Sequence, residues 1–232
     1  MKKNYSNSKF PYWNKTRSLK EFTFVLLLLC CFLVPNQLKA QIALRGTATT
    51  STSTNTNITI NKPTGVVAGD IMLVNIGKAG NNTTAPSLAG WTLISGANLN
   101  GGTSRYGAVL YRIAGGAEPA NYTFALGGGT NSASGGIIAF SGVDNTTPFD
   151  VGPGTISVQG NQTGVVGTGV TTTTTNTAII MFGQAAGDNP TYSGWNTTSP
   201  GGLTELFDVG QGNNDQSSAG GAWALKPTIG AT

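Results

Sequence analysis

Histidine is absent from this 232-residue sequence, and both of its cysteines, Cys30 and Cys31, lie close to the N-terminus. Beyond Ala40 the chain therefore has no imidazole and no thiol, the groups on which most catalytic bases and nucleophiles depend. The same stretch has no disulfide to stabilise it, and it lacks the nitrogen and sulfur ligands of common metal sites. These absences predict a protein that is not an enzyme and that carries no cofactor and no metal ion.

Charged residues are also scarce, since Asp, Glu, Lys and Arg make up 9% of the chain. Seven of the 13 basic residues precede residue 41, whereas only one of the nine acidic residues does. The remaining part holds six basic and eight acidic residues, so its net charge is −2 although the whole chain is +4. A domain with that balance has no basic patch for phosphate groups, and we expect no nucleic-acid partner.

The first 40 residues are typical of a secretory signal peptide. Basic residues dominate up to Lys20, residues 22–34 form an apolar run, and the small residue Ala40 precedes Gln41. The run has 13 residues, fewer than the roughly 20 that a membrane-spanning helix needs. We therefore predict cleavage after residue 40, a single domain over 41–232, and a secreted or cell-surface protein that meets the membrane only through its signal peptide. An uncleaved N-terminal anchor is the alternative.

Short apolar runs separated by clusters of Gly, Asn, Thr and Pro predict an all-β fold. Each run has four to eight residues and is rich in β-branched or aromatic side chains, and glycine recurs too often for stable helices. Period-two alternation predicts a core between two sheets formed by Ile71, Leu73, Leu110, Phe124, Ile138, Phe140, Ile180 and Phe182. The runs are 70–76, 91–94, 106–113, 122–126, 137–143, 178–182, 203–209 and 222–225.

A weak internal repeat refines this expectation. The first half reads IMLV, WTLI and GAVLYR from residues 71, 91 and 107, and the second reads IIMF, LTELF and GAWALK from 179, 203 and 221. Two related half-motifs suit a double Greek key, so we predict an antiparallel β-sandwich of jelly-roll type. Coincidence among β-strands of low complexity is the alternative.

The strings GDIMLV, GWTLI, VLYRIAGGAEPANYTF and GGIIAFSGVDNTTPFD, which begin at residues 69, 90, 109 and 135, resemble a jelly-roll module. That module occurs in bacterial secreted and cell-surface proteins and in some phage structural proteins. The resemblance covers about 42–227 and is weaker in the second half. It implies a β-sandwich in an adhesin-like or architectural setting, and it brings no catalytic residues.

The carboxylates are the remaining candidates for catalysis. Glycosidases place two of them roughly 5–10 Å apart. Glu205 and Asp208 lie on one expected strand, but their odd separation predicts opposite faces. Asp144 and Asp150 flank a turn, and Glu118 precedes a proline in an expected loop. No pair is therefore expected from one strand, although a pair assembled from different strands stays open.

Two aromatic residues offer the best candidate for ligand binding. Tyr192 and Trp195 lie in an expected polar loop beside Asp188 and Asn189. A flat ring stacks on a sugar face while neighbouring amides and carboxylates bind its hydroxyl groups. The alternative is that Trp195 closes one end of the sandwich, because tryptophan side chains are usually highly buried.

A second polar loop, over 210–218, joins this candidate surface through Asn213, Asn214 and Asp215. Its oxygen-rich composition, like that of the first loop, also suits Ca²⁺, but no D-x-D-x-D ladder is present, and turn formation explains the Asp and Asn residues. A further run of alternating threonines, residues 50–56, predicts a solvent-exposed strand surface.

Together these observations predict a secreted or cell-surface β-sandwich module with an adhesive or structural role. Its expected partner is an extracellular glycan or a cell-surface protein. A carbohydrate-binding module is the first alternative, and a glycan-cleaving enzyme of jelly-roll fold is the second. An exposed Trp195 in a groove favours the sugar binder, and a carboxylate pair beside it favours the enzyme.

Overall fold

Antiparallel β-strands dominate the protein. The computed structural model describes residues 41–98, 105–158, 164–186, 191–212 and 216–232, and within these ranges there is no helix. The predicted all-β antiparallel sandwich is therefore confirmed. In those ranges no helix is long and apolar enough to span a membrane. The strands are β1 (Ala43–Leu44), β2 (Thr49–Ser53), β3 (Asn57–Asn61), β4 (Ile71–Gly80), β5 (Thr92–Asn98), β6 (Arg105–Ile113), β7 (Asn121–Ala125), β8 (Thr130–Ser141), β9 (Thr171–Thr172), β10 (Thr177–Ala186), β11 (Thr204–Gln211), β12 (Ser217–Lys226) and β13 (Gly230–Ala231).

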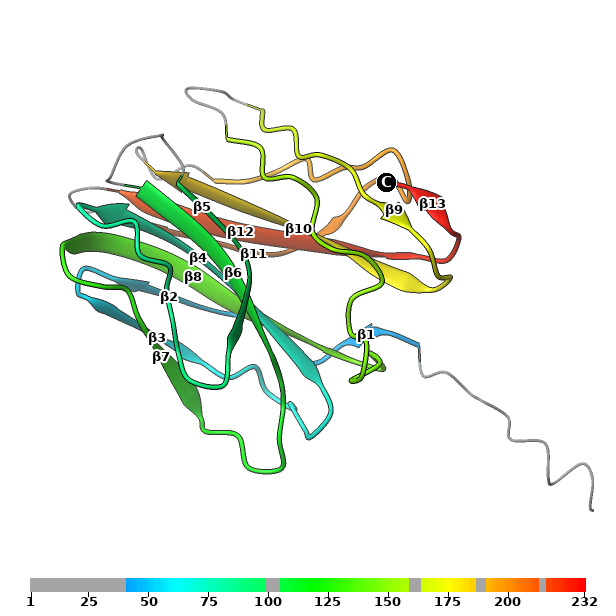
Figure 1. Cartoon of the computed structure of the whole chain (residues 1–232), viewed down its shortest axis with the longest axis horizontal. Coiled ribbons are helices and arrows are strands. Elements are labelled where there is room, and N and C mark those ends of the chain that lie inside the picture. The colour runs from blue at the N-terminus through cyan, green and yellow to red at the C-terminus, as the bar shows by residue number, and fades with distance from the viewer. Residues whose placement is uncertain (1–40, 99–104, 159–163, 187–190, 213–215) are drawn as a thin grey trace, which may run out of the picture. The chain divides into compact units, whose positions relative to one another are not determined.

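The strands form one large sheet and three smaller ones, all within the unit from residue 40 to residue 232. The large sheet has the order β1-β8-β4-β6-β5, and β2 also pairs with β8. A three-stranded sheet has the order β10-β12-β11, and two further pairs are β3-β7 and β13-β9. Figure 1 shows the large sheet between the β10-β12-β11 sheet and the β3-β7 pair. The large sheet is thus the middle one of three layers.

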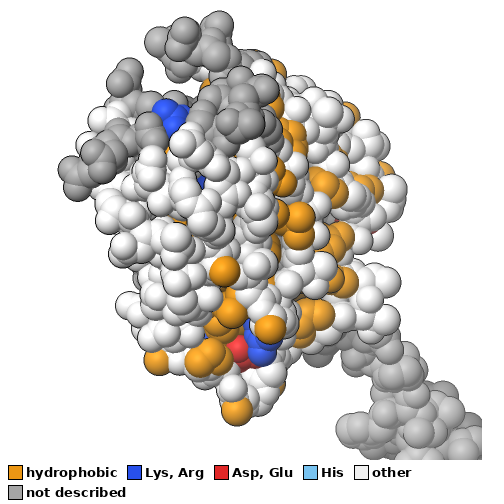
Figure 2. Space-filling view, turned by 60° about the vertical axis from the view of Figure 1, so that its left-hand side comes forward, with side chains coloured by type: hydrophobic (Ala, Val, Ile, Leu, Met, Phe, Trp, Pro, Cys, Tyr) orange, Lys and Arg blue, Asp and Glu red, His pale blue; other side chains and the backbone are white. Residues whose placement is uncertain are grey.

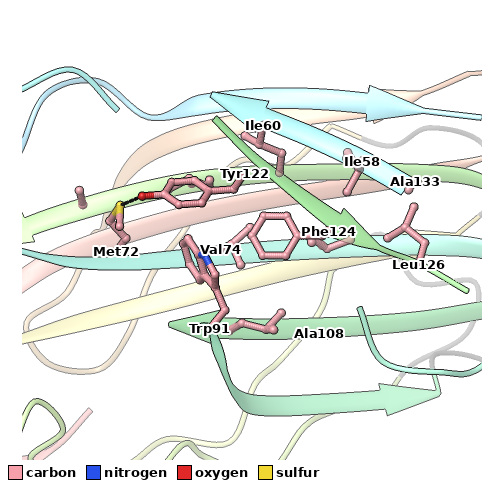
Figure 3. Close-up of a cluster of buried hydrophobic side chains, with 14 of the residues drawn as sticks. Ile58, Ile60, Met72, Val74, Trp91, Ala108, Tyr122, Phe124, Leu126 and Ala133 are labelled. Atoms are coloured by element: carbon pink, nitrogen blue, oxygen red, sulfur yellow. Dashed lines mark hydrogen bonds between the residues drawn. The ribbon is translucent and has the colours of Figure 1, made fainter. Parts of the chain in front are cut away.

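Strand β4 shows the consequence of this position, because all of its residues are buried. Its side chains alternate between two hydrophobic cores. Met72 and Val74 pack in a first core against β3 and β7, where Trp91 meets the rings of Tyr122 and Phe124 edge-on at 5.1 Å (Figure 3). On the opposite face a second core fills the space between the large sheet and the β10-β12-β11 sheet.

The predicted core residues divide between these two cores. Leu110 and Phe124 lie in the first core, whereas the other six lie in or against the second. Alternation is correct for each pair on one strand, and only Ile180 and Phe182 are partly rather than fully buried. The prediction of one inter-sheet core was therefore too simple, because β3 and β7 add a third layer.

The two halves indicated by the sequence repeat have the same strand order. In each half the first strand pairs with the third and the third with the second, giving β4-β6-β5 and β10-β12-β11. A β-bulge interrupts the second strand of each half, between Leu93 and Ser95 and between Glu205 and Phe207. The halves differ in what covers the matching face. In the first half β3 and β7 pack on it, and in the second half the loop 191–203 does.

Candidate functional site

The outer face of the β10-β12-β11 sheet carries two glycines directly opposite each other. Gly183 of β10 and Gly220 of β12 are paired in register. Their neighbours Phe182 and Ala219 pack at the second core, so alternation turns the glycines away from it. A Cβ atom on Gly220 would lie 2.6 Å from Cδ2 of Tyr192, and one on Gly183 would lie 2.7 Å from Cε1 of the same ring. Any side chain at these two positions would collide with the Tyr192 ring, so only glycine fits. The backbone surface at Gly183 and Gly220 is called the glycine floor below.

Trp195 lies beside Tyr192 on this floor. Cβ atoms on Gly183 and Gly220 would stand 3.2 and 3.1 Å from the Trp195 ring. The two ring centroids are 5.6 Å apart and the planes are tilted by 35°. Both side chains are half-buried, so each ring is held by the sheet and still has surface in contact with solvent. The structure thus brings together the two aromatic residues that the sequence singled out.

Two carboxylates hold the aromatic pair from strand β11. Oε2 of Glu205 accepts a hydrogen bond of 3.0 Å from Nε1 of Trp195, and Oδ2 of Asp208 accepts one of 2.8 Å from the backbone N–H of Tyr192. The Tyr192 hydroxyl lies 2.9 Å from Oγ of Ser218 on β12. Tyr192, Trp195, Glu205 and Asp208 above the two glycines are called the aromatic face below.

The prediction that Glu205 and Asp208 lie on opposite faces was wrong. Glu205 pairs with Ala222, but after the bulge Asp208 pairs with Gly220, and these two partners lie on one face of β12. The extra residue is Leu206, which packs against the second core together with its neighbour. The bulge therefore turns an odd separation into a shared face, and it brings both carboxylates to the aromatic pair.

The loop that carries the rings is fixed along its length. The backbone N–H of Leu203 donates to the carbonyl of Trp195 at 2.9 Å, which closes the loop on itself. Near its far end, Nζ of Lys226 donates to Oγ of Ser199 at 2.8 Å, and this lysine is only 1% exposed. Burial, with a smaller effect from the charge of Asp208, raises the pKa of Tyr192 to about 12. Its hydroxyl is therefore protonated at neutral pH.

The remaining predicted site residues lie outside the described residues. Asp188 and Asn189 precede the described part of the first loop, and Asn213, Asn214 and Asp215 fall in the gap between β11 and β12. The sequence did not indicate Glu205 and Asp208 as part of this site, since the bulge that places them has no clear signal in the residue pattern. The sequence likewise offered no reason to single out Gly183 and Gly220 from the 34 glycines of the chain.

Glu118 is the centre of a separate polar cluster on the first half. Its carboxylate accepts hydrogen bonds of 3.0 Å from Nε of Arg112, 2.6 Å from the Tyr122 hydroxyl and 2.6 Å from the backbone N–H of Gly115. Burial opposes its ionisation, but these donors and the guanidinium charge outweigh burial and lower the pKa of Glu118 to about 2. The predicted loop position is correct, and the carboxylate ties that loop to β6 and β7.

Three further carboxylates have structural partners. Asp70 forms a two-pronged ion pair with Arg45 at 2.8 and 3.1 Å. Asp144 accepts a 2.8 Å hydrogen bond from the backbone N–H two residues on and so caps its turn. Asp150 accepts 2.7 Å hydrogen bonds from the backbone and hydroxyl of Thr173. Each of these groups therefore fastens a loop, which leaves the aromatic face as the strongest candidate site.

Within the described ranges no three His, Cys, Asp or Glu residues are placed to hold a metal ion. The chain matches no family model, and neither a curated protein nor a solved structure shows significant similarity to it. The aromatic face is therefore interpreted from its own chemistry.

Proposed function

We propose that this protein is an exported, adhesive β-sandwich module that binds carbohydrate through the aromatic face. The observation that carries the proposal is the half-buried Tyr192–Trp195 pair, which stands on a glycine floor between two carboxylates. Aromatic surface binds the apolar face of a sugar ring, and adjacent oxygen atoms accept hydrogen bonds from its hydroxyl groups. Both parts of such a site meet here on one rigid sheet.

The fixed geometry supports binding at this face. Side-chain and loop ordering is a major cost of association, and a preformed site avoids most of it. Here the floor is a strand pair, the Trp195 and Tyr192 rings are hydrogen-bonded to Glu205 of β11 and Ser218 of β12, and the loop closes on itself. The comparison of the two halves adds a second reason, since the matching face of the first half is closed by β3 and β7.

A glycan array tests the proposal. The purified protein is expected to bind a defined set of extracellular glycans, and a Tyr192→Ala/Trp195→Ala double variant is expected to lose that binding. Thr59→Ala/Thr123→Ala, on the exposed outer face of the β3-β7 pair, is the matched control and is expected to bind as the natural protein does. Equal binding by a folded Tyr192→Ala/Trp195→Ala variant would show that the aromatic face is not the site.

Glycan cleavage is the second candidate, because the bulge places Glu205 and Asp208 on one face beside the aromatic pair. A pair of carboxylates beside a bound sugar is the minimal equipment of a glycosidase. Both groups already accept hydrogen bonds from N–H donors of the loop, which suits positioning better than proton donation, and we therefore rank binding first. Release of new reducing ends from a bound glycan, abolished by Glu205→Gln, would establish the enzyme instead.

A further inference from the structure

We infer that the aromatic face selects sugars that carry a free, protonated amine over neutral and anionic sugars. This inference rests on the proposed carbohydrate-binding function and names the class of glycan that the site prefers. It follows from the sign and the placement of the charges around Trp195.

Positive charge is nearly absent from the segments that build the aromatic face, and charged side chains are few on the side of the molecule that Figure 2 shows. Between Ile113 and Leu225 the sequence contains no Lys and no Arg, so neither the loop 191–203 nor β10 nor β11 carries one. The basic residue of β12 is Lys226, which is 1% exposed and donates to Ser199. These segments therefore offer no exposed cation to balance the charge of a uronic acid, a sulfated sugar or a sialic acid.

Negative charge, in contrast, lies at the edge of the rings. Glu205 is exposed and touches the indole through Oε2, which leaves its second oxygen for a ligand. Asp208 lies on the same face of β11, because its partner Gly220 is two residues along β12 from Ala222, the partner of Glu205. Because a sugar stacked on Trp195 would place its substituents beside these groups, an ammonium substituent would meet a carboxylate. The electron-rich face of the ring would attract the same cation.

Two oligosaccharides with the same backbone test this inference. Oligomers of β-1,4-linked glucosamine and their fully N-acetylated counterparts differ only in the charge and acetylation of the amine. Calorimetric titration at mildly acidic pH and low salt is expected to show about fivefold tighter binding of the free-amine oligomer, as expected for weak, exposed ion pairs. Added salt should reduce this ratio, because exposed charges are screened.

The effect of charge can be distinguished from the effect of structure with neutral variants that keep the hydrogen-bond acceptors. Glu205→Gln and Asp208→Asn retain an oxygen for the indole and backbone N–H donors, so the rings stay in place. Each is expected to lower the ratio towards one, because it weakens binding of the free-amine oligomer far more than binding of the acetylated oligomer, whereas Trp195→Ala should weaken the binding of both oligomers. A ratio of one in the natural protein, or binding only to a neutral or anionic glycan, would overturn the inference and leave carbohydrate binding standing. Binding to no glycan on the array would instead refute the proposed function.

Discussion

Placing a single methyl group beneath the aromatic pair is the sharpest structural perturbation of this site. In Gly220→Ala the new Cβ would lie 2.6 and 3.0 Å from two atoms of the Tyr192 ring and 3.1 Å from the Trp195 ring. Gly220 lies inside β12 with a strand on each side, so its backbone has little freedom to move. The rings and their loop must therefore shift away from the sheet.

The size of the effect follows from what the shift disrupts. Overfilling a well-packed site costs about 1–3 kcal/mol. A second estimate comes from losing the three hydrogen bonds that hold Tyr192 and Trp195, which run from Tyr192 to Asp208 and Ser218 and from Trp195 to Glu205. At about 0.5–1.5 kcal/mol each, they sum to roughly 1.5–4.5 kcal/mol. We expect Gly220→Ala to lower the free energy of unfolding by about 2 kcal/mol.

Chemical denaturation and quenching of tryptophan fluorescence by acrylamide are the assays. Gly202→Ala is the matched control, because its Cβ would meet no atom within 4 Å in the same loop, and its stability should change by less than about 0.5 kcal/mol. In Gly220→Ala the quenching should increase as Trp195 leaves the sheet. Unchanged stability and quenching in Gly220→Ala would refute the arrangement of rings on glycines.

Three other predictions concern the framework. Phe140→Ala, at a side chain that is 1% exposed in the second core, should cost about 2–5 kcal/mol in a denaturation experiment, whereas Phe149→Ala, at a 40% exposed ring, should cost much less. Burial lowers the pKa of Lys78 from 10.5 to about 8, so the folded protein releases this proton before the unfolded chain does. The free energy of unfolding of the natural protein should therefore rise between about pH 8 and pH 10.5 relative to that of Lys78→Met. A difference between the two proteins that stays constant over this pH range would contradict the lowered pKa of Lys78. Glu118→Gln should lose about 3 kcal/mol at neutral pH, and the difference from the natural protein should shrink as pH falls from 4.5 to about 2, because protonation then removes the same ion pair.

The strands were predictable where side chains carry the signal. Each of the eight apolar runs overlaps a strand, but β8 begins at Thr130, seven residues before the run that indicated it. The missing part is rich in Ser and Gly, which disfavour strands by propensity. Tertiary contacts override that preference, since a Cβ on Gly136 would lie 2.6 Å from the Phe207 ring. Glycine is used there because two sheets approach closely, and a local pattern does not report such contacts.

The third layer was missed for a related reason. Strand β3 has only two apolar residues, Ile58 and Ile60, each between exposed polar residues. Alternation in so short a segment is easily lost beside the threonine-rich stretch before it. Thr50 and Thr52 do lie exposed on β2, as the alternating threonines predicted. Without β3, however, the sequence offered no hydrogen-bonded partner for β7, and the fold was predicted to have two sheets.

The two aromatic residues of the aromatic face could be predicted from the sequence, but its two carboxylates could not. Tyr192 and Trp195 are large, close in sequence and surrounded by polar residues, so composition alone singled them out. The position of Glu205 and Asp208 depends on one extra residue in β11, and strict alternation gives the wrong face when a bulge intervenes. The matching bulge in β5 shows that this irregularity belongs to the repeated topology. When the two bulges are aligned, Leu110 corresponds to Ala222, whereas the sequence repeat aligns Leu110 with Ala224. The two halves therefore agree in strand order more closely than in residue-by-residue alignment.

Locating a bound glycan on the protein by NMR tests the central claim most directly. With a glycan that the array identifies, the account predicts chemical-shift changes confined to the Trp195 indole N–H and the backbone amides of Gly183 and Gly220, with no change at Thr59 and Thr123. Shift changes centred on the polar outer face of β3 and β7, with the Trp195 indole signal unmoved, would contradict it.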